Sequence, residues 1–157
     1  MKVMVVEDSP SMLKVIASML EGLGHGPVLE AKHGAEAWEQ LRKEPVDLLI
    51  TDWNMPVMSG LGLVQKVRQV PALADLPIIM ATSRKKTTDV IAAVKAGVNT
   101  YIIKPFTRGQ LQDRIDKTLK RSTGELGKQV EPIVASSKKL TLQDDFPVVL
   151  FGEIAST

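Results

Sequence analysis

The sequence contains no cysteine and no long apolar run, and only 4% of its 157 residues are aromatic. The lack of cysteine excludes disulfides, thiol catalysis and cysteine-ligated metals. The apolar runs are too short to span a bilayer, and the first ten residues, MKVMVVEDSP, contain two acids, unlike a signal peptide. Because the formal net charge is only +2, the chain has no overall electrostatic preference for nucleic acid or an anionic membrane. We therefore expect a cytoplasmic protein that binds neither nucleic acid nor membrane.

Short apolar runs alternate with segments of helical periodicity along the first three quarters of the chain. The runs expected to form strands are residues 2–6, 28–31, 46–51, 76–82 and 100–104. Apolar residues at helical spacing occur within residues 12–23, 61–67, 90–94 and 111–119. Several strands are almost wholly apolar, as expected for parallel strands buried on both faces. The alternation predicts an α/β fold with a parallel sheet and helices on both of its faces.

Polar side chains stand where four of the predicted strands end. Glu7 and Asp8 follow the first strand, Asp52 follows the third, Thr82 ends the fourth and Lys104 ends the fifth. Because the carboxyl ends of parallel strands meet at one edge of a sheet, we expect these groups to converge. A hard divalent cation would relieve the repulsion among three carboxylates, and Mg²⁺ binds carboxylates together with phosphate oxygens and water. The edge therefore predicts a Mg²⁺ site beside a centre of phosphoryl transfer.

Asp52 is the candidate for the reacting group in that centre. A carboxylate can attack phosphorus and form an aspartyl phosphate, a transfer that depends on positioning and charge neutralisation. Lys104 would place a point charge on the phosphoryl oxygens, and the Thr82 hydroxyl would donate to one of them. Taken singly, these residues have structural explanations, since Asp52 could form a turn and Glu7 with Asp8 could favour a helix amino terminus. Their joint placement on one edge favours the functional interpretation.

Residues 1–121 contain the motifs VVEDSP, TDWNMPVMSGLGLV, MATSRKK and AAVKAGVNTYIIKPFT. With these motifs the chain resembles the receiver domain of two-component response regulators, and most closely the stand-alone chemotaxis regulators among them. The resemblance implies a flavodoxin-like, doubly wound sheet of five parallel strands in the order 2-1-3-4-5. It also implies that a histidine kinase phosphorylates Asp52, and that the chain is a phosphoacceptor switch rather than an enzyme.

The resemblance further implies a metal site. Glu7, Asp8, Asp52 and the main-chain carbonyl of Asn54 would together hold Mg²⁺. Asn54 also bears on an alternative, a phosphohydrolase with an aspartyl-phosphate intermediate. Such enzymes of the haloacid-dehalogenase type place a second aspartate two residues after the nucleophile, where this chain has Asn54. The sequence therefore argues against turnover of outside substrates.

The remaining family positions concern the switch. Thr82 and Lys104 would bond to the phosphoryl group, and Tyr101 would be the aromatic residue whose ring turns inward when Thr82 moves. The peptide bond between Lys104 and Pro105 would be cis. The fourth helix, fifth strand and fifth helix would form the surface that binds a downstream target protein. Arg84, two residues after Thr82, occupies a position that tunes the lifetime of the aspartyl phosphate.

Residues 122–157 have no counterpart in a minimal receiver, and we expect a carboxy-terminal tail without a separate output domain. Its segment FPVVLF, residues 146–151, is apolar and is flanked by Asp144, Asp145 and Glu153. Such a segment could dock as an added strand on its own receiver or on a second copy, or could pack only for stability. Without an output domain, the chain could act in chemotaxis, as a phosphorelay intermediate or as a phosphate sink.

Overall fold

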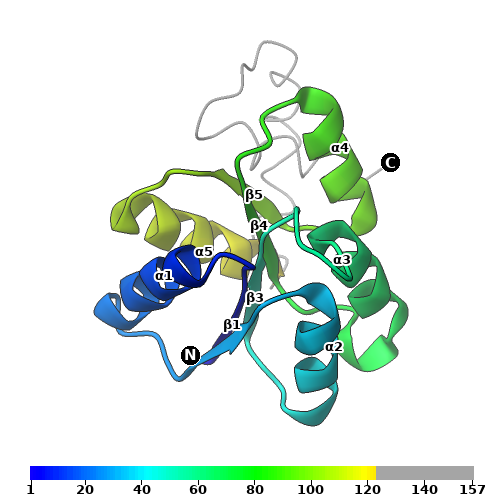
Figure 1. Ribbon diagram of the computed structural model, residues 1–157, viewed down its shortest axis with the longest axis horizontal. Coiled ribbons are helices and arrows are strands. Elements are labelled where there is room, and N and C mark those ends of the chain that lie inside the picture. The colour runs from blue at the N-terminus through cyan, green and yellow to red at the C-terminus, as the bar shows by residue number, and fades with distance from the viewer. Residues whose placement is uncertain (123–157) are drawn as a thin grey trace.

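The computed structural model describes residues 1–122, which form alternating strands and helices (Figure 1). The strands are β1 (Val3–Val6), β2 (Val28–Ala31), β3 (Leu48–Thr51), β4 (Ile78–Thr82) and β5 (Thr100–Ile103). The helices are α1 (Pro10–Gly22), α2 (Gly34–Lys43), α3 (Gly60–Gln69), α4 (Thr87–Ala96) and α5 (Arg108–Ser122), with the 3₁₀ helix η1 (Pro71–Leu73) before β4. None of these described helices is long and apolar enough to cross a membrane. The tail segment 146–151, for which docking and packing for stability alone are the alternatives, lies outside the described residues.

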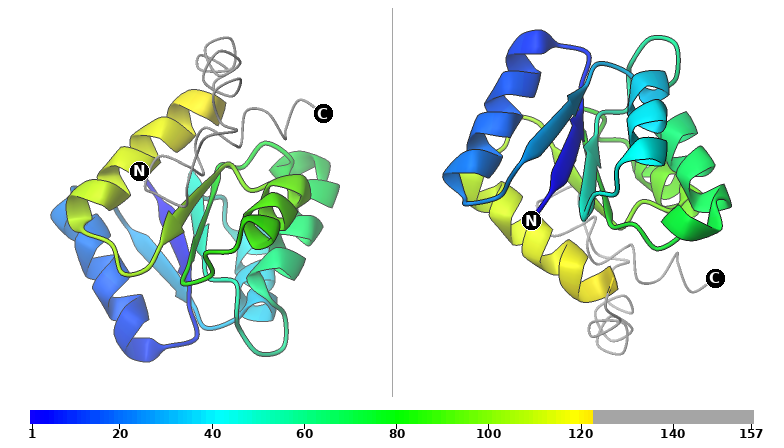
Figure 2. Two further views of the ribbon diagram at one scale, coloured as in Figure 1. Left: turned by 90° about the horizontal axis from the view of Figure 1, so that it is seen from above. Right: turned by 90° about the horizontal axis from the view of Figure 1, so that it is seen from below.

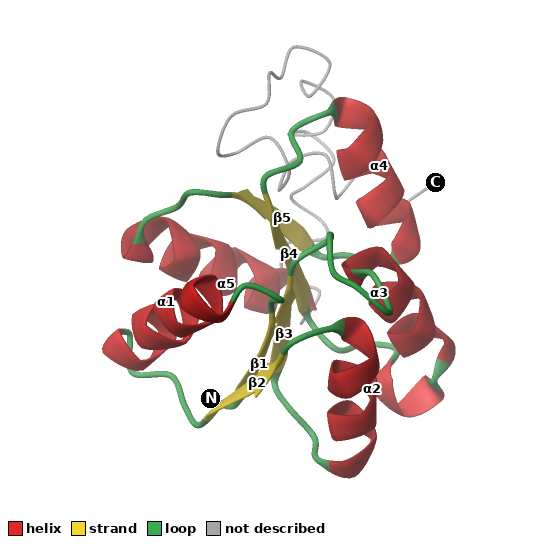
Figure 3. Ribbon diagram, viewed as in Figure 1, coloured by secondary structure: helices red, strands yellow, loops and turns green. Residues whose placement is uncertain are grey.

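The five strands form one parallel sheet in the order β2-β1-β3-β4-β5, which confirms the predicted fold and strand order. Helices α1 and α5 cover one face of the sheet, and α2, α3 and α4 cover the other (Figures 2 and 3). Because side chains alternate between faces along a strand, β1 contributes to two cores. Val3 and Val5 pack with residues of α1 and α5. Met4 and Val6 pack with residues of α2, α3 and α4.

The ends of several helices follow from local chemistry. Ser9 caps α1, since its hydroxyl accepts a hydrogen bond from the N–H of Met12. Before α5, Thr107 and Gln110 form the predicted capping box, in which each side chain accepts from the backbone N–H of the other at 2.8 and 3.1 Å. Helix α4 ends at Gly97, whose φ of 115° lies in the left-handed region that favours glycine.

Helix α2 is the element that the periodicity of the sequence did not reveal. Only Gly34, Ala37 and Leu41 of this helix are buried, and two of these residues are too small to mark an apolar stripe. His33 caps the helix through its Nδ1 atom, which accepts from the N–H of Glu36 at 3.2 Å. A histidine cap and a stripe of small residues give a weaker signal than the serine cap and leucine-rich stripe of α1.

Candidate phosphoacceptor site

Four strands carry polar side chains to the same edge of the sheet. Glu7 and Asp8 follow β1, Asp52 follows β3, Thr82 is the last residue of β4 and Lys104 follows β5. Oxygen atoms of the Glu7, Asp8 and Asp52 carboxylates all lie within 4.8 Å of one another. The Lys104 ammonium contacts two of these acids, Glu7 and Asp52. The structure therefore brings the predicted acids and the predicted lysine into one cluster.

Asp52 is held through both its backbone and its carboxylate. Its N–H donates to the carbonyl of Val6 at 2.9 Å, which extends the pairing of β1 and β3 by one residue. The Oδ1 atom accepts from the N–H of Trp53 at 2.7 Å, and Oδ2 lies 3.2 Å from the Nζ atom of Lys104. The Asp52 side chain remains 12% exposed, so a phosphoryl donor can reach a carboxylate whose position is otherwise fixed.

Helix α3 begins directly against the backbone of Asp52. The N–H of Gly60 donates to the carbonyl of Trp53 at 2.8 Å. A Cβ atom at position 60 would lie only 1.8 Å from the Asp52 carbonyl oxygen, so the close approach requires glycine. The sequence analysis assigned no role to Gly60. The available signal was a glycine in the first turn of a predicted helix, where most other residues would be more favourable.

Glu7 and Lys104 form an ion pair on the inner side of the cluster. Glu7 is buried, and its carboxylate accepts from the Lys104 ammonium and from the N–H of Ser9 at 3.1 Å. Burial raises the pKa of Glu7 above its ordinary value, and the negative charge of Asp52 adds to this effect. The hydrogen bonds from Lys104 and Ser9 act in the opposite direction. The cluster is thus crowded with negative charge that Lys104 only partly compensates.

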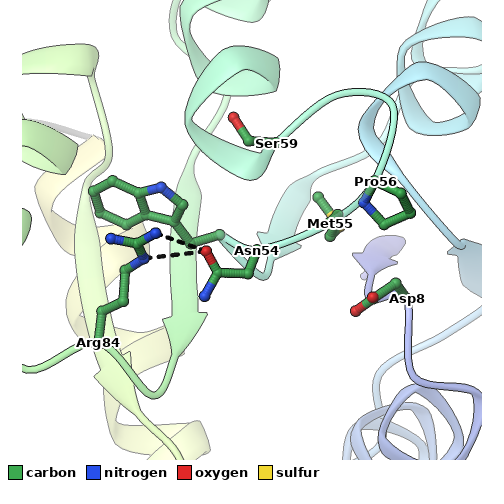
Figure 4. A pocket seen from close by; sticks show the side chains of 7 residues that line it. Asp8, Asn54, Met55, Pro56, Ser59 and Arg84 are labelled. Atoms are coloured by element: carbon green, nitrogen blue, oxygen red, sulfur yellow. Dashed lines mark hydrogen bonds between the residues drawn. The ribbon is translucent and has the colours of Figure 1, made fainter.

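The acidic cluster has the ligand chemistry typical of a Mg²⁺ site. It offers only hard oxygen donors, from the buried Glu7, the half-buried Asp52 and the exposed Asp8. Beside it lies a pocket of about 440 Å³, lined by Asp8, by residues of the β3–α3 loop and by Arg84 (Figure 4). The open side of the cluster therefore has room for water molecules and for a phosphoryl donor.

The two predicted switch residues lie next to this pocket, on β4 and β5. Thr82 is buried, and its Oγ1 atom accepts from the N–H of Arg84 at 3.3 Å. The ring of Tyr101 is also buried, and its hydroxyl donates to the Arg84 carbonyl at 3.1 Å. Burial raises the pKa of Tyr101 well above its ordinary value, and the negative charge of Asp89 adds to the shift. The peptide bond between Lys104 and Pro105 is cis.

Residues 3–116 match the sequence profile described as the response regulator receiver domain. The chain belongs to this family. The chain is 52% identical over 126 residues to the chemotaxis protein CheY homolog of Campylobacter jejuni, covering 80% of this chain and 97% of that protein. It is 49% identical over 120 residues to chemotaxis protein CheY1 of Helicobacter pylori, covering 76% of this chain and 97% of that protein. It is 40% identical over 124 residues to chemotaxis protein CheY of Pseudomonas aeruginosa, covering 79% and 100%.

Solved structures agree with this assignment. The chemotaxis response regulator CheY4 of Vibrio cholerae superposes with a TM-score of 0.70 at 30% identity, covering 74% of this chain and 97% of that one. The receiver domain of Francisella response regulator 1452 also gives a TM-score of 0.70, at 27% identity and with coverage of 77% and 98%. The receiver is a phosphoacceptor switch rather than an enzyme, as the resemblance implied.

Arg84 has contacts in the receiver that the sequence analysis did not anticipate. Its guanidinium lies over the ring of Trp53, with Cζ 4.5 Å from the ring centroid. Its Nε and Nη2 atoms donate to the Oδ1 atom of Asn54 at 3.2 and 2.8 Å (Figure 4). No sequence signal indicated these contacts, because they join two loops through the long side chain of one residue.

Proposed function

We propose that a histidine kinase phosphorylates this receiver on Asp52 in a Mg²⁺-dependent transfer, and that the phosphorylated protein acts on a target protein in chemotaxis. The observation that carries this proposal is the placement of a partly exposed Asp52 between Lys104 and two further carboxylates at one edge of the sheet. The chemotaxis assignment is supported by relatives named CheY, which the receiver matches over nearly their whole length.

The carboxylates of Glu7, Asp8 and Asp52, with the main-chain carbonyl of Asn54, would hold Mg²⁺. When bound, Mg²⁺ neutralises negative charge and orients phosphoryl oxygens. A carboxylate oxygen of Asp52 then forms a bond to phosphorus while the bond from phosphorus to the imidazole nitrogen of the donor breaks. The N–H of Trp53 fixes the carboxylate for this attack.

Two side chains would stabilise the transferred group. The Nζ atom of Lys104, 3.2 Å from Oδ2 of Asp52, is within reach of a phosphoryl oxygen bonded there. The Thr82 hydroxyl, which accepts a hydrogen bond from Arg84, still has its proton to donate to a second oxygen. Movement of Thr82 toward that oxygen would act on Tyr101, and through it on the target-binding surface formed by α4, β5 and α5.

The proposal is tested by intact-mass measurement after incubation with a small phosphodonor, with and without Mg²⁺. We expect one added phosphoryl group in the wild type, and none in Asp52→Asn or without the metal. Asp113→Asn, which changes an exposed acid on α5, is the matched control and should be phosphorylated normally. A phosphoryl group that still appears on Asp52→Asn, or a wild type that binds Mg²⁺ and takes none, would contradict the proposal.

Residues 122–157 are proposed to be a tail without its own output domain, and the cell compartment is proposed to be the cytoplasm. A phosphorelay intermediate or a phosphate sink remains the alternative to chemotaxis. A role in a phosphorelay is distinguished from one in chemotaxis by adding the phosphorylated receiver to a purified histidine-containing phosphotransfer protein. Rapid transfer of the phosphoryl group onward would favour the relay, whereas retention of the phosphoryl group on Asp52 would favour chemotaxis.

A further inference from the structure

Arg84 connects two parts of the receiver that are far apart in the sequence, the loop after Asp52 and strand β5. On the side of the loop, its guanidinium stacks on Trp53 at 4.5 Å and donates twice to Oδ1 of Asn54. A third contact, 3.5 Å from Nη1 to the Asp89 carboxylate, ties the same group to α4. The side chain is therefore held from three directions, and its position depends on where Asn54 and Trp53 lie.

The backbone of Arg84 holds the switch residues. Its carbonyl accepts from the hydroxyl of Tyr101 at 3.1 Å, and its N–H donates to Oγ1 of Thr82 at 3.3 Å. The Tyr101 ring is buried, so this carbonyl satisfies a hydroxyl that would otherwise be costly to bury. A shift of the Arg84 backbone would weaken that bond and favour movement of the ring.

The two lysines that follow Arg84 show that positive charge in the loop after β4 is not sufficient to form contacts with Trp53 and Asn54. Lys85 and Lys86 stand next in the sequence and are exposed, and neither forms an ion pair or a ring contact among the described residues. Only the planar, forked guanidinium can stack on an indole and donate two N–H groups to one amide oxygen at the same time. The arrangement is thus specific to Arg84.

We propose that Arg84 is a positioning residue that couples the loop after Asp52 to the inward placement of Tyr101. Its side chain responds to Asn54 and Trp53, and its carbonyl transmits that response to the Tyr101 hydroxyl. This gives the receiver a route from the Asp52 side of the site to β5 that operates beside the route through Thr82. The coupling is a property of the unphosphorylated protein, and only its meaning for signalling rests on the proposed function.

Tyr101 is the sole tyrosine of the chain, so fluorotyrosine labelling gives a single ¹⁹F resonance that reports this ring. The shift of the resonance between H₂O and D₂O increases with exposure of the ring. We would measure it, without added metal, in the wild type, Arg84→Ala, Asn54→Ala and the double variant. Lys85→Ala is the matched control, because it removes a neighbouring cation without these contacts. Circular dichroism and urea unfolding check that each variant is folded.

We expect Arg84→Ala and Asn54→Ala each to increase the exposure of Tyr101, and Lys85→Ala to leave it unchanged. The ratio of inward to outward ring should fall by roughly fivefold to tenfold, a factor typical of one lost side-chain hydrogen bond. In the Arg84→Ala background, Asn54→Ala should have no further effect, since the contact that carries the coupling is already gone. Arg84→Lys keeps the charge over Trp53 but not the fork, and should restore only part of the wild-type value.

The proposal is overturned if Asn54→Ala leaves the Tyr101 resonance as in the wild type, or changes it equally with and without Arg84. The first result would mean that Asn54 and Tyr101 are independent. The second would mean that Asn54 acts on Tyr101 by another path. Should Arg84→Ala fail to fold, Arg84→Lys provides the same comparison with Asn54→Ala. A negative result in this experiment would not contradict phosphorylation of Asp52, because phosphorylation is tested separately by intact mass.

Discussion

Replacing Gly60 by alanine should damage the candidate phosphoacceptor site while leaving every charged group of the site in place. A Cβ at this position would stand 1.8 Å from the Asp52 carbonyl oxygen, whereas such contacts are essentially never found below 3.0 Å. The start of α3 and the Asp52 backbone must therefore separate by roughly 1 Å. Overpacking of this kind costs about 1–3 kcal/mol of folding free energy. A displacement of about 1 Å in a reacting group can slow a reaction by roughly two orders of magnitude.

The matched control is Gly62→Ala, two residues along the same helix. A Cβ there would meet Oγ of Ser59 at 3.4 Å and Cγ of Met58 at 3.5 Å, both ordinary van der Waals contacts. Because alanine is favoured over glycine in a helix by about 1 kcal/mol, Gly62→Ala should be neutral or slightly stabilising. Urea unfolding gives the stability of both variants, and the time course of the added phosphoryl mass with a small phosphodonor gives their phosphorylation rates.

A Gly60→Ala variant that is as stable and as rapidly phosphorylated as Gly62→Ala would refute this reasoning. Such a result would show that α3 moves away from Asp52 at little cost, and that the contact does not fix the position of Asp52. A variant that loses stability but keeps its rate would mean that the helix shifts while Asp52 stays in place. Only a joint loss supports the view that Gly60 positions the Asp52 carboxylate for the proposed reaction.

Three further predictions test features away from the acidic cluster. Arg68→Ala should lower the free energy of unfolding by roughly 2–4 kcal/mol, because the guanidinium donates to the carbonyls of Gly97 and Ala74. Its phosphorylation rate should not change, and a slower rate would place Arg68 in the site after all. Val57→Gly should raise the unfolding free energy by about 1 kcal/mol, because φ at this 81% exposed residue is 69°, a conformation that glycine adopts at little cost; unchanged urea unfolding would show that the turn is unstrained. Burial raises the pKa of Tyr101, so above the ordinary tyrosine pKa of about 10 the folded state retains a proton that the unfolded state loses. The free energy of unfolding of the wild type should therefore fall as the pH rises above about 10, and that of Tyr101→Phe should fall less. Equal decreases in the two proteins, measured by urea unfolding, would contradict this prediction.

The sequence predicted the fold because its signals are local and repeated. Near-continuous apolar runs marked the parallel strands, and the parallel arrangement alone placed Glu7, Asp52 and Lys104 at one edge. The strand order came from the family resemblance, since no local pattern states which strands are neighbours. Helix α2 was missed because it buries small residues, and its cap, His33, is not among the residues usually expected there.

The candidate site was predictable only as far as backbone topology determines it. The contacts of Arg84 with Asn54 and Trp53 depend on two loops whose conformations have no periodic pattern. The role of Gly60 depends on an atom that is absent, a Cβ that would meet the Asp52 carbonyl. Spacing in the sequence can show which residues reach an edge of a sheet. It does not show how closely two backbones approach, or which side chain bridges two loops.

The two ends of the parallel strands differ in charge crowding and backbone strain. At the edge where β4 and β5 begin, the Oδ1 atom of Asn99 accepts from the N–H of Ile78 at 2.7 Å and from Arg68 at 2.9 Å. At the opposite edge, three carboxylates crowd together and Val57 carries a positive φ in a γ-turn closed by the N–H of Met58. Local rules are commonly broken at functional sites and kept elsewhere. Substitutions at the first edge should therefore cost stability without altering phosphorylation. At the second edge, relieving the positive φ of Val57 should gain stability, whereas a change that displaces Asp52, such as Gly60→Ala, should slow phosphorylation.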